Sequence, residues 1–339
     1  MLDFCYLVNP YFPNKKLIDE MQANFQTLLT QYPSGMHINS LIAAKNFGLK
    51  EPQIIVGNGA AELIKSLMEK LIGKIGVLHP SFEEYANRRK AEDLVPFVCQ
   101  NPDYTYTADE LMEFYDKTDI KNLLIVNPDN PSGNYIPKAD VIRLIAWAKQ
   151  RSIKLVIDES FVDFVDMEEN TTLLEQSLLN SNPHLYVVKS ISKSYGVPGL
   201  RLGILASGDA EAIATMKKDV AIWNINSFAE FYMQIYEKYK SAYAAGLTRF
   251  YQTRKKFIED LAEISFLRVI PSQANYVLCE ITKDYTSTGL TTILLEDNIL
   301  IKDLSTKKGF EGKQYVRIAV RDEEDNQMLI SALKALLLK

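Results

Sequence analysis

The chain has 339 residues, which is long enough for one large domain or two modest domains with a substantial hydrophobic core. Hydrophobic residues make up 47% of it and charged residues 24%, as in ordinary globular proteins. The formal net charge is -5 and no block rich in lysine and arginine occurs, which argues against nucleic acid or an anionic membrane as the main partner. No apolar run reaches transmembrane length.

The cysteines and histidines give no sign of a metal site. Cys5, Cys99 and Cys279 lie far apart and are odd in number, and the three histidines add no cluster. We therefore expect no bound metal and a reducing, cytoplasmic setting. No secretory leader pattern opens the chain. Because the chain starts abruptly in an apolar segment, residues 1–13, we also expect that it could be one domain of a longer polypeptide.

Short apolar runs alternate with helix-like segments between about residues 54 and 207. Several of the runs are apolar without alternation, as strands buried on both faces should be. The expected strands are 53–59, 74–80, 94–100, 122–128, 153–160, 184–190 and 201–207, and the expected helices between them are 60–71, 82–93 and 138–151. This order predicts an α/β fold with a mostly parallel seven-stranded sheet covered by helices on both faces.

The rest of the chain has a different pattern. A long helical stretch at 228–264, with a break expected near Gly246, precedes four expected strands and a terminal helix. These strands are 266–272, 274–281, 299–305 and 314–321, and the helix is 324–339. The pattern predicts a large domain over residues 40–230 and a smaller α+β domain formed by residues 1–39 and 231–339.

Ligands of open α/β sheets bind at the carboxyl ends of the strands, so the residues that follow the expected strands matter most. The stretch 57–61, Gly-Asn-Gly-Ala-Ala, opens a helix, and glycines at a helix start let backbone N–H groups approach a phosphate. Taken alone, these glycines are better explained by a plain tight turn. The pattern is not GxGxxG and lacks an acidic residue about twenty positions on, which argues against a dinucleotide site.

Three further strand ends carry unusual side chains. Ser81-Phe82 places an aromatic ring after one strand, for which core packing is the simpler explanation. Residues 127–133, Asn-Pro-Asp-Asn-Pro-Ser-Gly, hold two Asn-Pro pairs that force a specific turn. Asp158-Glu159 follows four apolar residues, so a buried carboxylate there needs a cationic or hydrogen-bonded partner. Capping of a helix after the strand explains these carboxylates equally well.

The stretch 187–203, VVKSISKSYGVPGLRLG, places polar residues between two buried strands. Arg201 begins an apolar strand, where a lone cation would be costly without an anion. An arginine, the hydroxyls of Ser190 and Ser192 and a glycine-opened helix together form a phosphate-binding set. Lys193 is then either one more phosphate contact or a nucleophilic amine. Lys189 and Ser194 receive no role and are interpreted as ordinary loop residues.

The segment SISKSYGVPGLRLG resembles the pyridoxal-phosphate lysine motif of the fold-type-I aminotransferases of class I/II, S-x-S-K-x-x-G-x-x-G-x-R-x-G. Other motifs follow in the same order: GNGAAELI resembles the phosphate cup, NPDNPSG the asparagine turn and VIDESFVDF the cofactor-aspartate strand. IPSQANYVLCEI and QYVRIAVR resemble the carboxylate-binding region. Histidinol-phosphate aminotransferase and threonine-phosphate decarboxylase are the most similar branches.

The resemblance implies pyridoxal 5'-phosphate as cofactor. Lys193 would hold it as a Schiff base and then act as general acid and base. Asp158 would pair with the pyridine nitrogen, Asn130 would bind the 3-oxygen of the ring and Phe82 would stack on its face. The residues implied to cradle the phosphate are Gly59, Ala60, Ala61, Ser190, Ser192 and Arg201.

The resemblance also assigns residues to the substrate and to a second subunit. Arg317 would bind the α-carboxylate as a fork, and Asn9 and Lys302 would contact the substrate as well. Tyr32 resembles a tyrosine that reaches the phosphate of the neighbouring subunit, which implies a homodimer with a shared active site.

Two residues depart from the family pattern. Phe161 stands where aminotransferases usually place a tyrosine that hydrogen-bonds the 3-oxygen, so one support for the proton transfers of the lysine is missing. Lys302 stands where an arginine usually binds the distal phosphate of the substrate, and lysine keeps the charge but loses the fork. The short N-terminal arm leaves the substrate lid undefined.

We predict an aminotransferase that acts on a small amino acid or amine with a distal anion, phosphate or phosphonate, together with a keto acid. The first alternative is a decarboxylase of an amino-acid phosphate, which uses the same residues but breaks a different Cα bond. An alternative of another class is a catalytically idle binding domain of a larger fused protein. We expect neither nucleic acid nor a membrane as partner.

Overall fold

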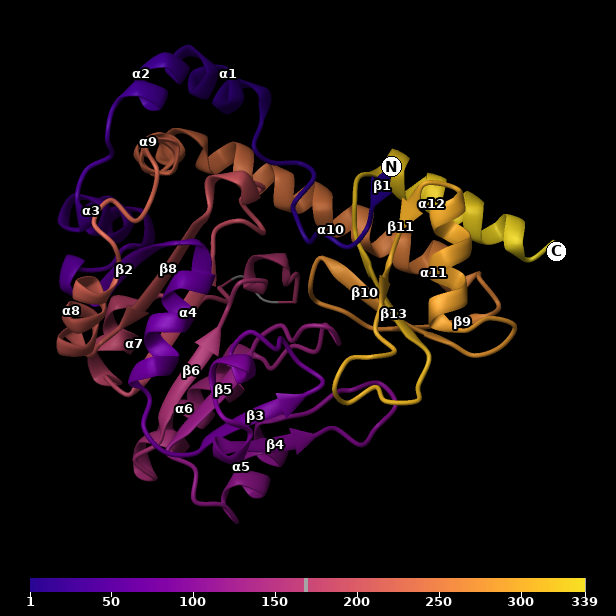
Figure 1. The fold of residues 1–339 in the computed structure, drawn as a ribbon, viewed down its shortest axis with the longest axis horizontal. Helices are drawn as coiled ribbons and strands as arrows, with labels where there is room; N and C mark the ends of the chain where they lie inside the picture. The colour runs from indigo at the N-terminus through magenta and orange to yellow at the C-terminus, as the bar shows by residue number, and fades with distance from the viewer. Residues whose placement is uncertain (168–169, 339) are drawn as a thin grey trace.

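The computed structural model describes residues 1–167 and 170–338. Its largest sheet has seven strands in the order β2-β8-β7-β6-β5-β3-β4 (Figure 1). The strands are β2 (Ile54–Asn58), β3 (Ile75–His79), β4 (Leu94–Val98), β5 (Asn122–Val126), β6 (Lys154–Asp158), β7 (Leu185–Ser190) and β8 (Leu202–Ser207). Only β8 runs antiparallel to its neighbours, β2 and β7. The prediction of a mostly parallel seven-stranded sheet in an α/β fold is confirmed.

Helices cover both faces of this sheet because alternate residues of each strand point to opposite faces. In β6, Leu155 and Ile157 pack into one core with α3 (Met36–Phe47), α5 (Ala108–Tyr115), α6 (Lys138–Gln150), α7 (Gln176–Ser181) and α9 (Ser227–Ile235). Val156 of the same strand packs into a second core with α4 (Gly59–Lys70) and α8 (Ala210–Asp219). The sheet is therefore buried on both sides, and its polar strand ends are the exceptions.

A smaller α+β unit follows in the chain, and Figure 1 shows it in orange and yellow beside the large sheet. Its four-stranded antiparallel sheet has the order β12 (Lys302–Asp303), β13 (Tyr315–Ala319), β10 (Tyr276–Ile281) and β9 (Leu267–Ile270). The helices α10 (Lys240–Ala262), α11 (Ser287–Glu296) and α12 (Glu323–Leu336) pack with it around a core of their own. Lys339, the last residue of the expected terminal helix, lies outside the described residues.

The N-terminal segment contributes to both units. β1 (Leu2–Asp3) pairs in parallel with β11 (Ile299–Leu300), and Phe4 and Leu7 belong to the core of the smaller unit. Phe12 and Leu17 instead join the core of the larger unit, where α1 (Lys15–Ala23) and α2 (Phe25–Thr30) lie beside α9 (Figure 1). The division into residues 40–230 and the two flanking segments stays a prediction.

The helix break expected at Gly246 is wrong. The chain changes to a 3-10 helix at Tyr236–Tyr239, between α9 and α10, and Gly246 lies inside α10. A Cβ atom at position 246 would lie 3.1 Å from the carbonyl oxygen of Tyr11. The glycine is therefore explained by the close approach of the N-terminal segment to α10.

Two other expected elements differ in the structure. The segment 82–93 forms only two 3-10 turns, Ala86–Arg88 and Ala91–Asp93, while the guanidinium of Arg89 donates to the carbonyl oxygens of Leu71 and Gly73. This tertiary contact stabilises the irregular conformation of the segment in place of the regular helix that was expected. The expected strand 299–305 is split into β11 and β12, which belong to different sheets. Within the described chain no helix is both long and apolar enough to span a membrane.

Candidate active site

A cavity of about 510 Å³ opens at the carboxyl ends of β5, β6 and β7. Nine of the residues predicted from the sequence to bind the cofactor line it: Ala60, Ala61, Phe82, Asn130, Asp158, Ser190, Ser192, Lys193 and Arg201. Eight further lining residues were not predicted to bind the cofactor: Tyr6, Leu7, Val8, Ile64, Val126, Ser160, Phe161 and Pro198. The strands bring together residues that are more than a hundred positions apart in the sequence. This is expected because ligands of open α/β sheets bind at the carboxyl ends of the strands.

Asp158 is the buried carboxylate at the end of β6. The hydroxyl of Tyr85 donates to its Oδ2 at 2.8 Å, and the backbone N–H of Ser160 donates to its Oδ1 at 2.9 Å. Burial raises the pKa of Asp158, while the hydrogen bonds from Ser160 and Tyr85 and the charge of Lys193 oppose that rise. The carboxylate is thus fixed in orientation and would be stabilised by a cation placed in the cavity.

Tyr85 and Ser160 are functional candidates that sequence reasoning missed. Tyr85 is fully buried and packs edge-on against Phe82, with the ring centroids 6.2 Å apart. Its position three residues after Phe82, in the segment PSFEEY, was the available signal. Ser160 gave no signal of its own, because a serine two residues after a carboxylate is common in turns.

Lys193 lies on the loop after β7, with its amine at the cavity. Burial lowers its pKa, and the charges of Arg317 and Arg201 add to this effect while Asp158 opposes it. A lysine whose pKa is lowered is more often neutral and therefore more nucleophilic. Its backbone oxygen accepts from the N–H of Asn9 at 2.9 Å, and its Nζ lies 5.9 Å from the centroid of the Phe161 ring.

One end of the cavity fits an anion. The hydroxyl of Ser192 is buried and has no hydrogen-bond partner among the described residues. The start of α4 and the guanidinium of Arg201 lie at this end, and a Cβ atom on Gly59 would collide with that guanidinium. Arg201 itself has a left-handed backbone with φ +54°, which is uncommon for a residue with a side chain. An unpaired hydroxyl, an arginine and a helix start are the donors that a phosphate group needs.

Arg317 of β13 contacts Asn130, which lines the cavity. Its Nη1 donates to Oδ1 of Asn130 at 2.8 Å and its Nη2 to the carbonyl oxygen of Cys5 at 2.9 Å. Its Nε is buried and has no partner among the described residues. Because Arg317 occupies the amide oxygen of Asn130, the amide nitrogen of Asn130 is left as the donor toward the cavity.

Five predicted residues do not line the cavity: Gly59 and Arg317, described above, and Tyr32, Lys302 and Asn9. Tyr32 is 79% exposed and stacks on Trp223, with a centroid distance of 4.5 Å. Lys302 is exposed on β12. Asn9 is buried behind Lys193, where its amide nitrogen donates to the carbonyl oxygen of Ser194 at 2.8 Å and its oxygen accepts from the N–H of Tyr11. The side chain of Asn9 is thus engaged with the protein backbone.

Asp129 supports the wall that carries Asn130 and Phe82. Its carboxylate accepts hydrogen bonds from the hydroxyls of Ser81 and Ser132, and burial raises its pKa to about 6. Its backbone oxygen accepts from the hydroxyl of Tyr276 at 2.6 Å. Among the described residues this carboxylate, which precedes the cavity residue Asn130, forms no ion pair.

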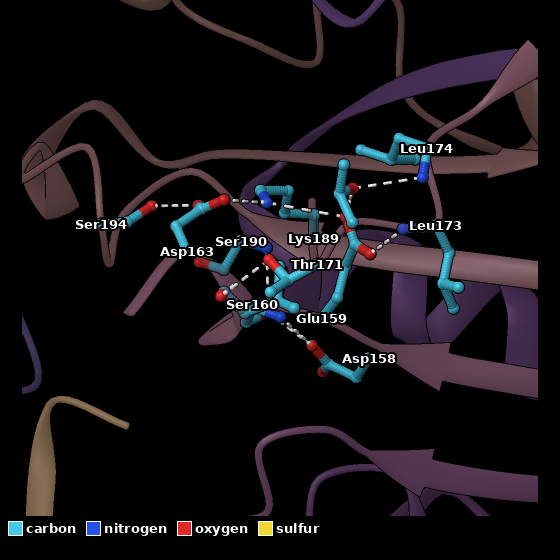
Figure 2. Close-up of polar contacts among 12 residues, drawn as sticks. Asp158, Glu159, Ser160, Asp163, Thr171, Leu173, Leu174, Lys189, Ser190 and Ser194 are labelled. Atoms are coloured by element: carbon cyan, nitrogen blue, oxygen red, sulfur yellow. Dashed lines mark hydrogen bonds and ion pairs between the residues drawn. The ribbon is translucent and has the colours of Figure 1, made fainter. Parts of the chain in front are cut away.

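The interpretation of Lys189 and Ser194 as ordinary loop residues is wrong. Lys189 is only 2% exposed and lies within β7, where its Nζ is 2.7 Å from Oδ1 of Asp163 and 3.5 Å from Oε1 of Glu159. The hydroxyl of Ser194 donates to the other carboxylate oxygen of Asp163 (Figure 2). A buried lysine needs such anionic partners, and the composition of the loop alone did not show them.

Residues 13–333 match the family model of the class I and II aminotransferases. The chain belongs to this family. It is 30% identical to L-serine phosphate decarboxylase of Sulfurospirillum multivorans, over 99% of this chain and 88% of that protein. It is 31% identical to a histidinol-phosphate aminotransferase of Thermoanaerobacter sp., over 87% of this chain and 81% of that protein. The family prediction, including both branches, is confirmed.

Other comparisons support the same assignment. A decarboxylase structure from Sulfurospirillum multivorans superimposes with a TM-score of 0.88 at 27% identity, covering 99% of this chain and 95% of that one. The CMP-5'-(3-aminopropyl)phosphonate synthase of Streptomyces rubellomurinus is 30% identical over 98% of this chain but only 52% of its own length. The chain thus spans about half of that relative.

The cofactor of this family is pyridoxal 5'-phosphate, and the described residues fit it. The unpaired hydroxyl of Ser192 and the guanidinium of Arg201 suit the phosphate. Lys193 has the lowered pKa of a nucleophilic amine, and Asp158 lies in the same cavity. The individual roles assigned to these residues stay predictions.

Proposed function

We propose that this protein is a pyridoxal-phosphate-dependent decarboxylase of a small amino acid that carries a phosphate group. The predicted transaminase activity is less well supported. Relatives named L-serine phosphate decarboxylase, from Sulfurospirillum multivorans and Campylobacter jejuni, are 30% and 26% identical over 99% and 98% of this chain. The threonine-phosphate decarboxylase of Salmonella typhimurium is 27% identical over 99% of it.

The observation that carries the proposal is Phe161. The centroid of its buried ring lies 5.9 Å from Nζ of Lys193 and 5.1 Å from the centroid of the Tyr276 ring. Position 161 therefore presents no hydroxyl to the amine. Transamination requires Lys193 to move a proton between two carbon atoms, whereas decarboxylation requires a single proton at Cα. The loss of a hydrogen-bonding group beside the lysine is more compatible with the simpler transfer.

The substrate class follows from two cations on neighbouring strands. Arg317 of β13 and Lys302 of β12 are directly paired in the antiparallel register. Paired residues of neighbouring antiparallel strands have their side chains on the same face, with Cβ atoms about 5 Å apart. Arg317 points to Asn130 at the cavity wall. Two cations this close suit a short substrate whose carboxylate and phosphate are separated by only a few bonds.

In the proposed decarboxylation each of four side chains has a separate role. The cofactor, when bound, withdraws electrons from the Cα atom of the substrate. Asp158 would stabilise a positive charge on the cofactor, and Phe82 would cover the flat face of its ring. Arg317 orients an anionic group of the substrate through its free Nε. Lys193 then delivers a proton to Cα after carbon dioxide has left.

Transamination is the second candidate. A histidinol-phosphate aminotransferase structure from Clostridium acetobutylicum superimposes with a TM-score of 0.86 at 27% identity and covers 99% of both chains. The same cavity residues would serve that reaction, which needs a keto acid as a second substrate. The predicted location in the cytoplasm also stays a prediction.

A product assay distinguishes the two reactions. Purified protein with pyridoxal phosphate and O-phospho-L-serine or O-phospho-L-threonine is expected to release carbon dioxide and an amino-alcohol phosphate in equal amounts without a keto acid. Carbon dioxide and the amine are measured separately, and each assay is repeated with 2-oxoglutarate. Formation of a keto product that depends on 2-oxoglutarate, without carbon dioxide, would replace decarboxylation with transamination.

We further propose that two copies of the chain form a homodimer through the surface around Tyr32. This surface holds exposed apolar side chains, including Ile222, which is 76% exposed, and the stacked pair of Tyr32 and Trp223. Large apolar patches on a soluble protein mark contact sites. Ile222→Asp is expected to weaken self-association at least tenfold in sedimentation velocity experiments. Ile72→Asp, at a site that is 85% exposed and follows α4, is the matched control and should leave the dimer intact.

A monomeric wild-type protein at micromolar concentration would contradict the proposed dimer. Equal dissociation of the Ile72→Asp and Ile222→Asp variants would contradict the proposed surface.

A further inference from the structure

A buried ionic network lies behind the loop that carries Lys193. Its centre is Lys189, whose ammonium group contacts the carboxylates of Asp163 and Glu159 (Figure 2). Glu159 also accepts hydrogen bonds from the hydroxyl of Thr172 and from the N–H of Leu173, at 2.9 Å for the latter. Lys189 and Glu159 are both almost fully buried, so this network is part of the protein interior.

Asp163 contacts the polypeptide on both sides of Lys193. Its Oδ1 binds Lys189, four residues before Lys193, and its Oδ2 accepts from the hydroxyl of Ser194, the next residue. Asp163 lies in the 3-10 helix Val162–Phe164, whose own position is fixed by the hydroxyl of Tyr251 bound to the Asp163 carbonyl oxygen at 2.9 Å. A single carboxylate therefore connects the two flanks of the predicted catalytic lysine.

A second connection joins the same two segments nearer the cavity. The Oγ atom of Ser160 accepts from the N–H of Ser190 at 2.9 Å and donates to Oδ1 of Asp158. The segment 158–163 therefore meets the segment 189–194 at both ends. One segment carries the predicted cofactor carboxylate, Asp158, and the other carries Lys193. The hydrogen bonds and ion pairs between them set the relative position of these two groups.

Stability alone does not account for this arrangement. A buried ion pair often contributes no more to stability than apolar residues of the same volume. Here two carboxylates face one ammonium group, and burial raises the pKa of Glu159 while the charge of Lys189 opposes that rise. What charged and hydrogen-bonded contacts supply, and apolar packing does not, is a defined direction at each contact.

We propose that Asp163 is a positioning residue which, through Ser194 and Lys189, fixes the backbone around Lys193 so that its amine meets the cofactor beside Asp158. Small displacements of a reacting group lower rates strongly, so the loss of one connection next to Lys193 should be measurable. The inference rests on the proposed role of Lys193 and holds for decarboxylation and transamination alike. The Lys193→Ala variant tests that role separately.

The test compares two hydroxyls of the same network. Ser194→Ala removes the connection next to Lys193, and Thr172→Ala, the matched control, removes a hydroxyl that bonds to Glu159 and not to Asp163. The first readout is the rate at which pyridoxal phosphate becomes covalently attached to the cofactor-free protein, followed by mass spectrometry after borohydride reduction. The second readout is kcat and KM for carbon dioxide release, and the third is the urea unfolding midpoint.

Ser194→Ala is expected to slow covalent attachment and to lower kcat by about tenfold or more, with KM and the unfolding midpoint close to the wild-type values. Thr172→Ala should change both rates less than about twofold. Attachment and kcat of Ser194→Ala within twofold of wild type would overturn the proposal, and so would equal losses in both variants. If Ser194→Ala does not fold, Asp163→Asn is measured in the same way, and attachment at the wild-type rate overturns the proposal.

Discussion

Replacing Lys193 with alanine is expected to lower kcat by about ten thousandfold or more while the chain still folds. The amine of Lys193 is the group predicted to attach to the cofactor and to return the proton to Cα, and no other lysine lines the cavity among the described residues. Removal of a group that acts at both stages should therefore leave almost no turnover. The measurement is carbon dioxide release, together with the mass of the protein after incubation with pyridoxal phosphate and borohydride.

The control for this variant is Lys218→Ala, which removes an exposed lysine of α8 and should leave activity and covalent labelling unchanged. Circular dichroism and the urea unfolding midpoint show whether Lys193→Ala keeps its fold. Retained turnover in folded Lys193→Ala would contradict the assignment of the lysine. If the wild-type protein itself shows neither labelling nor turnover, the alternative of an idle binding domain gains support.

Asp129→Asn is expected to make the folded protein more stable at neutral pH. Burial raises the pKa of Asp129 to about 6, whereas an aspartate in an unfolded chain has a pKa of about 3.9. The folded state therefore holds the proton of Asp129 more tightly than the unfolded state does. Its contribution to stability is fully present below about pH 4 and is lost as the pH rises to about 6.

The size of this effect follows from the difference between the two pKa values, about 2 units, which corresponds to about 3 kcal/mol of unfolding free energy. Asparagine has nearly the shape of the protonated acid and can still bond to the hydroxyls of Ser81 and Ser132. The variant should match wild type near pH 4 and exceed it by up to about 3 kcal/mol at pH 7. Urea unfolding of both proteins at intervals between pH 4 and pH 7 measures the difference.

Asp297→Asn, which removes an exposed carboxylate at the end of α11, is the control and should show no such change between pH 4 and pH 7. A constant difference between Asp129→Asn and wild type across this range would contradict the titration of Asp129.

Much of the candidate site could be predicted because it follows from the topology of the sheet. Asn130, Asp158 and Lys193 each come after a strand with a clear apolar run, and parallel strands end at the same edge. Their meeting in one cavity therefore needs no knowledge of side-chain packing. The seven strands were predictable for the same reason, since buried strands leave a strong hydrophobic signal.

Other features depend on tertiary contacts that a single sequence does not display. Tyr85 falls in an expected helix and Lys189 was interpreted as an ordinary loop residue, yet each is buried against a carboxylate from another segment. Gly246 has the local signature of a helix break, but the approach of Tyr11 explains it. Asn9 was predicted from resemblance to touch the substrate, and the fold places its amide on the backbone next to Lys193. In each case the partner lies far away in the sequence.

The antiparallel direction of β8 has a consequence for how the site is assembled. Because β8 returns beside β7, the chain makes only a short excursion between Lys193 and Arg201 before both strands are paired. Closing so short a loop costs little chain entropy compared with bringing distant segments together. The amine predicted to attach to the cofactor and the arginine predicted to bind its phosphate can therefore approach each other as soon as this one strand pair forms. The part of the predicted cofactor site formed by Lys193 and Arg201 is therefore local in the chain. The residues from the other strands join it only when those strands pair with the sheet.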